Sequence, residues 1–149
     1  MLGEKSIWEL PKTAFLCSDM FSAGSVLKSY DWAGEMKRAN QCVMSGFQSK
    51  MERDVFEILL KGSSPLIWVI SRGMFDRTPV KMQVHISSGR LLIVSPFDQA
   101  IKRPNRKLAF ERNQFVVDNA DELVFAHIHK GGMLERLMVG KKMVSILDE

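Results

Sequence analysis

The segment KLAFERNQFVV, residues 107–117, places a cation where a helix would normally turn an apolar side chain toward a core. Leu108, Arg112 and Phe115 recur at the spacing of one helical face, which predicts that Arg112 lies on the buried stripe. A guanidinium stays protonated inside a protein, and a buried charge without partners is very costly. Arg112 must therefore meet an internal carboxylate, solvent at the end of its long side chain, or the phosphate of a ligand.

A local excess of positive charge surrounds this arginine. Residues 101–112 contain one carboxylate, Glu111, against the cations Lys102, Arg103, Arg106, Lys107 and Arg112. The whole chain has a net charge of +4, which is compatible with a polyanionic partner without requiring one. Part of the cluster falls in residues 95–105, the longest irregular stretch of the sequence, and such loops are often functional.

Small, polar or basic residues follow the apolar runs that we predict to be strands. The carboxyl ends of parallel strands meet at one edge of a sheet, where hydroxyls, flexible backbone and cations suit phosphate oxygens. Glycine and serine also follow strands simply because turns need them. The strand-end residues are Ser18, Ser45, Gly46, Ser71, Arg72, Gly73, Ser95, Pro96, Lys130, Gly131 and Gly132.

Sequence fingerprints of nucleotide-dependent enzymes are missing. The stretch CSDMFSAGS after the first predicted strand has neither the G-x-G-x-x-G nor the Walker A pattern. His127 and His129 are predicted on one face of a strand, but no further ligand is spaced near them, so we expect no metal and no cofactor. Glu52 and Glu135 could each serve as an acid or base, or simply stabilise a helix start. A non-enzymatic function is favoured, and an enzymatic one stays open.

The elements that must position these residues alternate along the chain. Six nearly continuous apolar runs read as strands buried on both faces of a parallel sheet: residues 13–17, 42–44, 66–70, 91–94, 122–128 and 143–147. Amphipathic stretches separate them, so we predict an α/β sandwich around a mostly parallel sheet with right-handed crossovers.

Five helices are predicted besides the one at residues 107–117. Ser49 and Glu52 are spaced as the capping box of a helix through residues 51–59. Thr78 and Pro79 fit the N-cap and first position of another. The remaining three are predicted around residues 32–39, in the opening stretch and at residues 131–139.

Length and composition predict one globular domain over residues 1–149, with 46% hydrophobic and 26% charged residues. Cys17 and Cys42 both fall in predicted buried strands, which is typical of free thiols in a reducing compartment. The charged opening stretch lacks the apolar core of a secretory signal, and no apolar run reaches the length of a membrane span. We therefore expect a cytoplasmic protein with no membrane partner.

The order of these motifs resembles the core of the DNA-processing protein A family, also called Smf. The resemblance covers about residues 12–147 through the stretches VMSGF, WVISRGMFD, GRLLIVSPF and FERNQFVVDNADELVF. The last stretch is the most specific, because in the family an aromatic residue and an Arg-Asn pair open a helix that leads into a D-x-(L/V)-V-V strand. The corresponding residues here are Phe110, Arg112, Asn113, Asp121 and Val124. The resemblance implies a Rossmann-like three-layer α/β/α sandwich around a mostly parallel sheet.

The resemblance also implies a function. Family members are bacterial proteins that bind single-stranded DNA on a basic pocket at the strand ends and help to load recombinase during transformation, in DNA uptake and recombination. A homodimer is a further implied assembly. The residues predicted to bind phosphate or nucleic acid are Ser18, Ser45, Gly46, Phe47, Arg72, Gly73, Lys102, Arg103, Arg106, Phe110, Arg112, Asn113, Lys130, Gly131 and Gly132.

The chain departs from the family pattern at two places. Family members carry Gly-Ser-Arg after the first strand, whereas this chain has Cys17-Ser18-Asp19, with an acid in place of the cation. After Ser-Gly the family continues through a Gly-Ile-Asp motif, whereas residues 47–52 read FQSKME.

Two alternative functions remain. The stretch HKGGMLERL is similar to the Pro-Gly-Gly-x-Gly-Thr-x-x-Glu motif of the lonely-guy phosphoribohydrolases through Gly131, Gly132 and Glu135, but it lacks the proline, third glycine and threonine. This keeps open a small-molecule nucleotide-binding or nucleotide-hydrolysing protein with a nucleotide or phosphate ligand. The third interpretation is a degenerate family member that retains only protein contacts.

Overall fold

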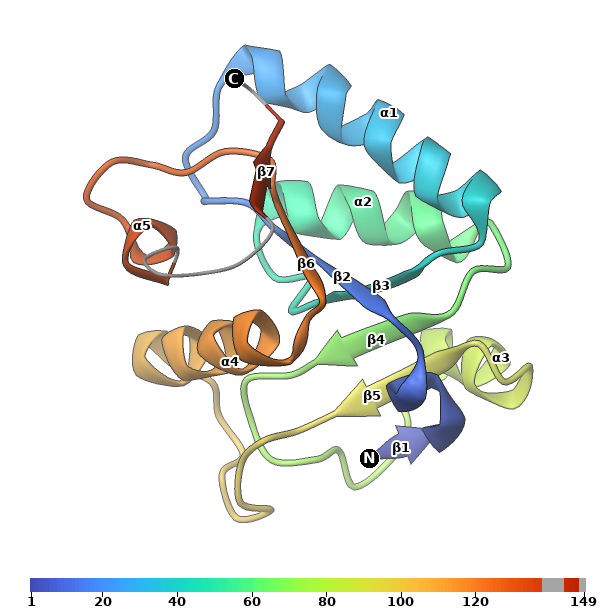
Figure 1. Ribbon diagram of the computed structural model, residues 1–149. Helices are drawn as coiled ribbons and strands as arrows, with labels where there is room; N and C mark the ends of the chain where they lie inside the picture. The colour runs from blue at the N-terminus through green and yellow to red at the C-terminus, as the bar shows by residue number, and fades with distance from the viewer. Residues whose placement is uncertain (138–143, 148–149) are drawn as a thin grey trace.

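The computed structural model describes residues 1–137 and 144–147. Within these residues a seven-stranded sheet has the order β1-β5-β4-β3-β2-β6-β7 (Figure 1). The strand at the β5 edge, β1, is antiparallel, and every other neighbouring pair is parallel. The strands are β1 (Leu2–Gly3), β2 (Lys12–Leu16), β3 (Cys42–Ser45), β4 (Leu66–Val69), β5 (Leu91–Val94), β6 (Glu122–Phe125) and β7 (Val144–Ile146). The predicted mostly parallel α/β sheet is confirmed.

Helices cover both faces of the sheet. The helices α1 (Ala23–Ala39) and α2 (Lys50–Leu60) lie on one face, and α4 (Arg106–Asn119) lies on the other (Figure 1). The short α5 (Met133–Leu137) packs on the α4 side. The 3-10 helix η2 (Val80–Met82) and α3 (Gln83–Ser87) belong to the side of α1 and α2. The predicted three-layer arrangement is therefore present.

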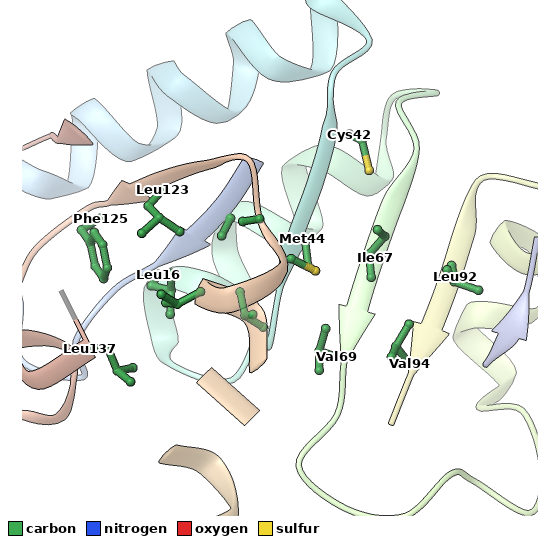
Figure 2. Close-up of a cluster of buried hydrophobic side chains, with 14 of the residues drawn as sticks. Leu16, Cys42, Met44, Ile67, Val69, Leu92, Val94, Leu123, Phe125 and Leu137 are labelled. Atoms are coloured by element: carbon green, nitrogen blue, oxygen red, sulfur yellow. The ribbon is translucent and has the colours of Figure 1, made fainter. Parts of the chain in front are cut away.

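Each central strand contributes to a core on both faces. In β2, Ala14 and Leu16 pack toward α4, whereas Phe15 packs toward α1 and α2. Figure 2 shows the α4-side core, in which neighbouring strands present Met44 and Ile67. Successive residues of a strand point to opposite faces, so a strand covered on both sides needs apolar residues throughout. This explains the nearly continuous apolar runs in the sequence.

Some local predictions were wrong. The opening stretch forms β1 and a 3-10 helix, η1 (Lys5–Glu9), instead of an α-helix. Pro79, and not Thr78, holds the N-cap position of η2, and no side chain caps it. The strand β6 ends at Phe125, so His127 and His129 lie beyond it and not on one strand face.

Other local predictions hold. The capping box formed by Ser49 and Glu52 at the start of α2 is confirmed, with both of its hydrogen bonds present. Residues 138–139 of the predicted last helix and residue 143 of the predicted last strand lie outside the described residues. Among the residues that are described, no helix combines the length and apolar character needed to cross a membrane.

The strand order reverses between β2 and β6. The chain steps from β2 through β3 and β4 to β5 in one direction, and then returns to place β6 on the opposite side of β2. Connections leaving β2 and β6 diverge at such a point, which leaves a crevice outside the carboxyl ends of the strands. The residues that follow β2, β3 and β6 are therefore positioned to form a site.

Candidate functional site

A cavity of about 650 Å³ opens at this reversal point. It is bounded by the loops after β2, β3 and β6 and by the first turns of α4 and α5. Its polar lining includes Ser18, Asp19, Gln48, Asn105, Arg106 and His129. We call it the first cavity.

Arg112 lies at the base of the first cavity and is only 3% exposed, which confirms its predicted place on the buried stripe. Its Nε donates to Oδ1 of Asn113 at 2.8 Å, and Nη2 donates to Oε1 of Gln48 at 2.7 Å. Its Nη1 donates to the carbonyl oxygen of Val69 at 3.3 Å. Burial lowers the pKa of Arg112, and the nearby charge of Glu52 opposes that shift. The buried arginine is thus held by neutral acceptors.

The buried carboxylate of Glu52 complements this arginine. One of its oxygens accepts from the backbone N–H groups of Gln48 at 2.9 Å and Ser49 at 3.2 Å, and the other accepts from that of Cys17 at 3.1 Å. Glu52 therefore ties the end of β2 to the start of α2. Together Arg112 and Glu52 fix the loops that follow β2, β3 and β4.

The segment between β3 and α2 adopts a conformation that serves this arrangement. A Cβ atom at Gly46 would overlap the guanidinium of Arg112, so only glycine leaves room there. Phe47 follows in the left-handed region with φ of 48°, which is rare for an aromatic residue. Its ring is buried and stacks on Phe56 at 4.1 Å between centroids. Phe47 thus anchors the loop in the core, next to Gln48.

The loops after β2 and β6 are joined by hydrogen bonds. The backbone N–H of His129 donates to Oγ of Ser18 at 3.0 Å, and the N–H of Ser18 donates to the carbonyl of His127 at 3.2 Å. The N–H of Gly132 donates to the carbonyl of His129 at 2.9 Å, and that of Gly131 donates to Oε1 of Glu135 at 3.2 Å. The amides of the Gly-Gly pair are therefore engaged within the protein.

The N-terminal end of α4 forms the basic side of the first cavity. The Asn105 side chain caps the helix by accepting from the N–H of Leu108 at 2.8 Å. The first turn contains no acidic residue and begins with Arg106 and Lys107. Cations are unfavourable here, because the helix dipole places partial positive charge at its N-terminus. Local stability does not explain this choice of residues.

The neighbouring cations differ in how they are paired. Lys102 contacts Asp76 at 3.3 Å, and this contact lowers the pKa of Asp76. Lys107 reaches Glu111 at 4.0 Å. Within residues 1–137 and 144–147, neither Arg103 nor Arg106 forms an ion pair. Both arginines are exposed, so their charge is available to a ligand.

The structure brings some of the predicted binding residues together and separates others. Those that line the first cavity are Ser18, Arg106, Arg112, Asn113 and Gly132. Lys102 and Arg103 line a neighbouring cavity. Lys130 and Gly131 are exposed on the loop before α5. Ser45, Gly46 and Phe47 are buried beneath the loop that follows β3.

Three further predicted residues are engaged elsewhere. The guanidinium of Arg72 lies over the Phe75 ring at 4.9 Å and its Nε donates to the carbonyl of Gly73. A Cβ atom at Gly73 would overlap the carbonyl of Asp98, so the glycine allows this close approach. The Phe110 ring is covered by Arg136 at 4.7 Å.

Sequence reasoning did not select Gln48 and Asn105 as site residues. Asn105 could have been found, because an asparagine directly before a periodic helical stretch is an N-cap signal. Gln48 has no such local signal, since its partner Arg112 is 64 residues away. In the part of the chain that the structure describes, no three His, Cys, Asp or Glu side chains are grouped to hold a metal ion.

The sheet order and the crevice at its reversal point define a Rossmann-like α/β protein. Among solved structures, DNA processing protein A from Helicobacter pylori, described for its single-stranded DNA binding mode, is similar with a TM-score of 0.71 and 17% identity. The match covers 91% of this chain and 64% of that protein. DNA processing protein A from Streptococcus pneumoniae gives a TM-score of 0.70 at 18% identity, covering 96% of this chain and 54% of that protein. The predicted resemblance in fold is confirmed.

A more distant similarity links the chain to the molybdenum cofactor binding protein of Rippkaea orientalis. The TM-score is 0.57 at 10% identity, with 86% of this chain and 68% of that protein covered. No protein-family model matches the sequence, and no curated protein matches it. At these identities the similarities establish the fold, over less than two thirds of the length of either DNA processing protein.

Proposed function

We propose that this protein binds single-stranded DNA, without catalysing a reaction, through the N-terminal end of α4 and the adjoining first cavity. The observation that carries the proposal is the unbalanced positive charge at this helix end. Arg106 and Lys107 occupy a first turn without acids, and Lys102 and Arg103 lie just before the N-cap of the same helix. Charges of the unfavourable sign cost about 0.3–1 kcal/mol each at a helix end. A phosphate placed there would convert this repulsion into attraction.

The distribution of the cations favours a polymer over a small nucleotide. Arg106 lines the first cavity, whereas Arg103 and Lys107 face its neighbour, so the charge extends along the surface. A basic surface that follows a phosphate backbone is typical of proteins that bind single strands. The structural similarity to a protein described for its single-stranded DNA binding mode supports the same choice.

The alternative nucleotide ligand has less support from the geometry. It relied on Gly131 and Gly132 as a phosphate-binding turn and on Glu135 as an acid or base. The amide of Gly132 donates to His129 within the loop, and that of Gly131 donates to the side chain of Glu135 itself in α5. Phosphate-binding turns direct such amides at the ligand. These groups are instead used to close the loop before α5.

Arg112 has a positioning role in this proposal. Three of its nitrogens donate to protein acceptors, and a guanidinium has five N–H donors in all. The donors that remain belong to terminal nitrogens beside the first cavity, but the bonded ones already hold the loops after β3 and β4. Arg112 therefore shapes the site, while Arg106 and Arg103 supply accessible charge.

The proposal is tested by the salt dependence of binding. Fluorescence anisotropy of a labelled oligothymidylate, titrated with protein at several salt concentrations, should give a log-log slope of about −0.7 per phosphate neutralised. Arg106→Ala should weaken binding and make the slope less steep by about 0.7. Lys81→Ala is the matched control, because Lys81 is an exposed cation that lines neither cavity.

Two results would contradict the proposal. The first is an affinity that does not change with salt, and the second is an equal effect of the Arg106 and Lys81 variants. A thermal-shift series with nucleoside mono-, di- and triphosphates tests the alternative ligand. A nucleotide at a hundred times its dissociation constant adds about 2.7 kcal/mol to the free energy of unfolding.

A further inference from the structure

A second cavity, of about 670 Å³, lies beside the N-terminal end of α4. Its apolar lining consists of Phe97, Ile101 and Leu108. Its charged lining consists of three cations, Lys102, Arg103 and Lys107, and one acid, Glu111. Asn105 lines both cavities, so they adjoin at the N-cap of α4.

The apolar residues of the second cavity do not serve the fold as core residues. Within residues 1–137 and 144–147, neither hydrophobic core includes Phe97, Ile101 or Leu108. All three are partly exposed. Apolar side chains that line an open, cation-rimmed cavity suit a ligand with a flat apolar part and a negative charge.

The loop that carries these residues is held in place. The N–H of Phe97 donates to Oγ of Ser95 at 3.2 Å, and the N–H of Ile101 donates to the carbonyl of Asp98 at 3.0 Å. The carbonyl of Ile101 accepts from the N–H of Gly73 at 2.6 Å, which ties the loop to the segment after β4. The second cavity is therefore formed by an ordered loop before any ligand arrives.

We propose that the second cavity binds a base of the same DNA strand whose phosphates contact the N-terminal end of α4. This inference rests on the proposed function. Aromatic side chains beside cations are the usual means of binding single strands, because every base offers a flat face and every nucleotide brings a negative phosphate. Phe97 supplies the aromatic surface, and Arg103 and Lys107 supply the cations at the same cavity.

The arrangement also defines a path for the strand. Arg106 lines the first cavity and Arg103 lines the second, with Asn105 between them. A strand that passes over the N-cap of α4 would bring phosphates to both arginines and a base to Phe97. A short oligonucleotide fills one cavity, whereas a longer one fills both and binds more tightly.

The experiment compares oligothymidylates of about 4 to about 16 nucleotides, the range of site sizes in other single-strand binding folds. Binding of the full chain is measured by anisotropy for wild type, Phe97→Ala and Phe97→Leu. Phe97→Ala should weaken binding of the longest oligonucleotide about tenfold and leave its salt slope unchanged, since no cation is removed. Phe97→Leu should lose less, and the shortest oligonucleotide should bind all three proteins equally.

Two further variants make the result specific. Val80→Ala removes an exposed apolar side chain that lines neither cavity and should leave binding unchanged at every length. Arg103→Ala leaves the aromatic ring of Phe97 in place. It should reduce only the increase in affinity between the shortest and the longest oligonucleotide. If circular dichroism indicates that Phe97→Ala does not fold, Arg103→Ala still tests whether the second cavity binds DNA.

The outcomes separate this inference from the function on which it rests. If wild type binds with a salt slope but Phe97→Ala and Arg103→Ala match it at every length, the second cavity is not a base site, and the proposed function stands through Arg106 at the first cavity alone. If wild type binds no oligonucleotide, the proposed function fails first. If Phe97→Ala changes the sedimentation of the protein and not its DNA affinity, the cavity faces another copy of the chain and the inference is overturned.

Discussion

Arg112 holds the loops after β3 and β4 through neutral oxygens, so its removal should affect stability before it affects binding. Arg112→Ala removes the side-chain donor to the Val69 carbonyl and the stronger of two donors to the Gln48 amide oxygen, and it removes the cation near buried Glu52. We expect the free energy of unfolding to fall by about 3 kcal/mol, measured by urea denaturation. Arg103→Ala, at an exposed arginine, should change it by less than about 0.5 kcal/mol. Equal stability of the two variants would mean that Arg112 does not clamp the loops.

Asp19 opposes a phosphate at the first cavity. It is exposed at the cavity lining, where the family that the sequence resembles carries a cation. Asp19→Asn removes a like charge and should tighten DNA binding about threefold at low salt, with the gain fading as salt rises. Anisotropy titrations of this variant and of Asp31→Asn, an exposed acid that lines neither cavity, provide the comparison. Weaker binding by Asp19→Asn would assign the carboxylate a favourable role.

Cys42 should make stability depend on pH in the alkaline range. Burial raises the pKa of Cys42 from its ordinary value of 9.0 to about 11, and the nearby charge of Lys12 opposes this shift. The neutral thiol therefore stabilises the folded protein fully below pH 9, and this contribution is lost as pH rises toward 11. The loss corresponds to about 2–3 kcal/mol.

Comparison of wild type with Cys42→Ala isolates the contribution of the thiol to the free energy of unfolding, because lysine and tyrosine side chains titrate in both proteins. Urea denaturation at intervals between pH 8 and about pH 11 should give a steeper decline for wild type than for the variant. Parallel declines would mean that the thiol ionises as readily in the folded protein as in the unfolded chain.

For single residues, the sequence predicted where a side chain lies better than which groups it contacts. The spacing of Leu108, Arg112 and Phe115 was sufficient to place the arginine on a buried face. Its acceptors could not be predicted, because Gln48 and Val69 are 64 and 43 residues away in the sequence. The sequence considered a carboxylate, solvent or a phosphate as its partner, whereas the protein groups that it contacts are neutral oxygens.

At the scale of elements, α4 balances its own stability against binding. Arg106→Glu replaces a cation by an acid at the helix N-terminus, where the dipole favours negative charge. We expect the free energy of unfolding to rise by up to about 1 kcal/mol while DNA affinity falls, since the charge now repels phosphate. Urea denaturation and anisotropy on the same preparation measure both effects. A variant that is both less stable and unchanged in binding would contradict this account of α4.

The central strands could be predicted because they are buried on both faces, and α2 because it carries a clear N-cap. The runs of β2 to β5 needed only the rule for doubly covered strands, and α2 was marked by its capping box. The two-residue β1 could not be predicted, because it forms only through pairing with β5, which is distant in the sequence. The strand β6 ends earlier than its apolar run, which continues through Ala126 and Ile128 into the loop at the site.

At the scale of the whole molecule, the two hydrophobic cores share one sheet. Each central strand contributes to both, so neither core can be lost alone. The expectation that residues 1–149 form one domain leads us to predict a single cooperative unfolding transition. Calorimetric and van't Hoff enthalpies should agree. Two resolved transitions would indicate separately folding units.

The biological setting remains a prediction from the resemblance. The resemblance implies a bacterial, cytoplasmic role in DNA uptake or recombination, and a homodimer. Sedimentation of the protein with and without an oligonucleotide would measure its assembly. The fold itself was predicted correctly, because the alternation of apolar and amphipathic stretches spans the chain.

Phosphate binding by the N-terminal end of α4 is tested most directly by anisotropy of a labelled oligothymidylate of about 16 nucleotides. The titrations compare wild type, Arg106→Glu and Lys81→Ala across a salt series. We expect salt-dependent binding by wild type and Lys81→Ala, and much weaker binding by a folded Arg106→Glu. Equal binding by all three proteins, or binding that does not respond to salt, would contradict a phosphate-binding role for the N-terminal end of α4.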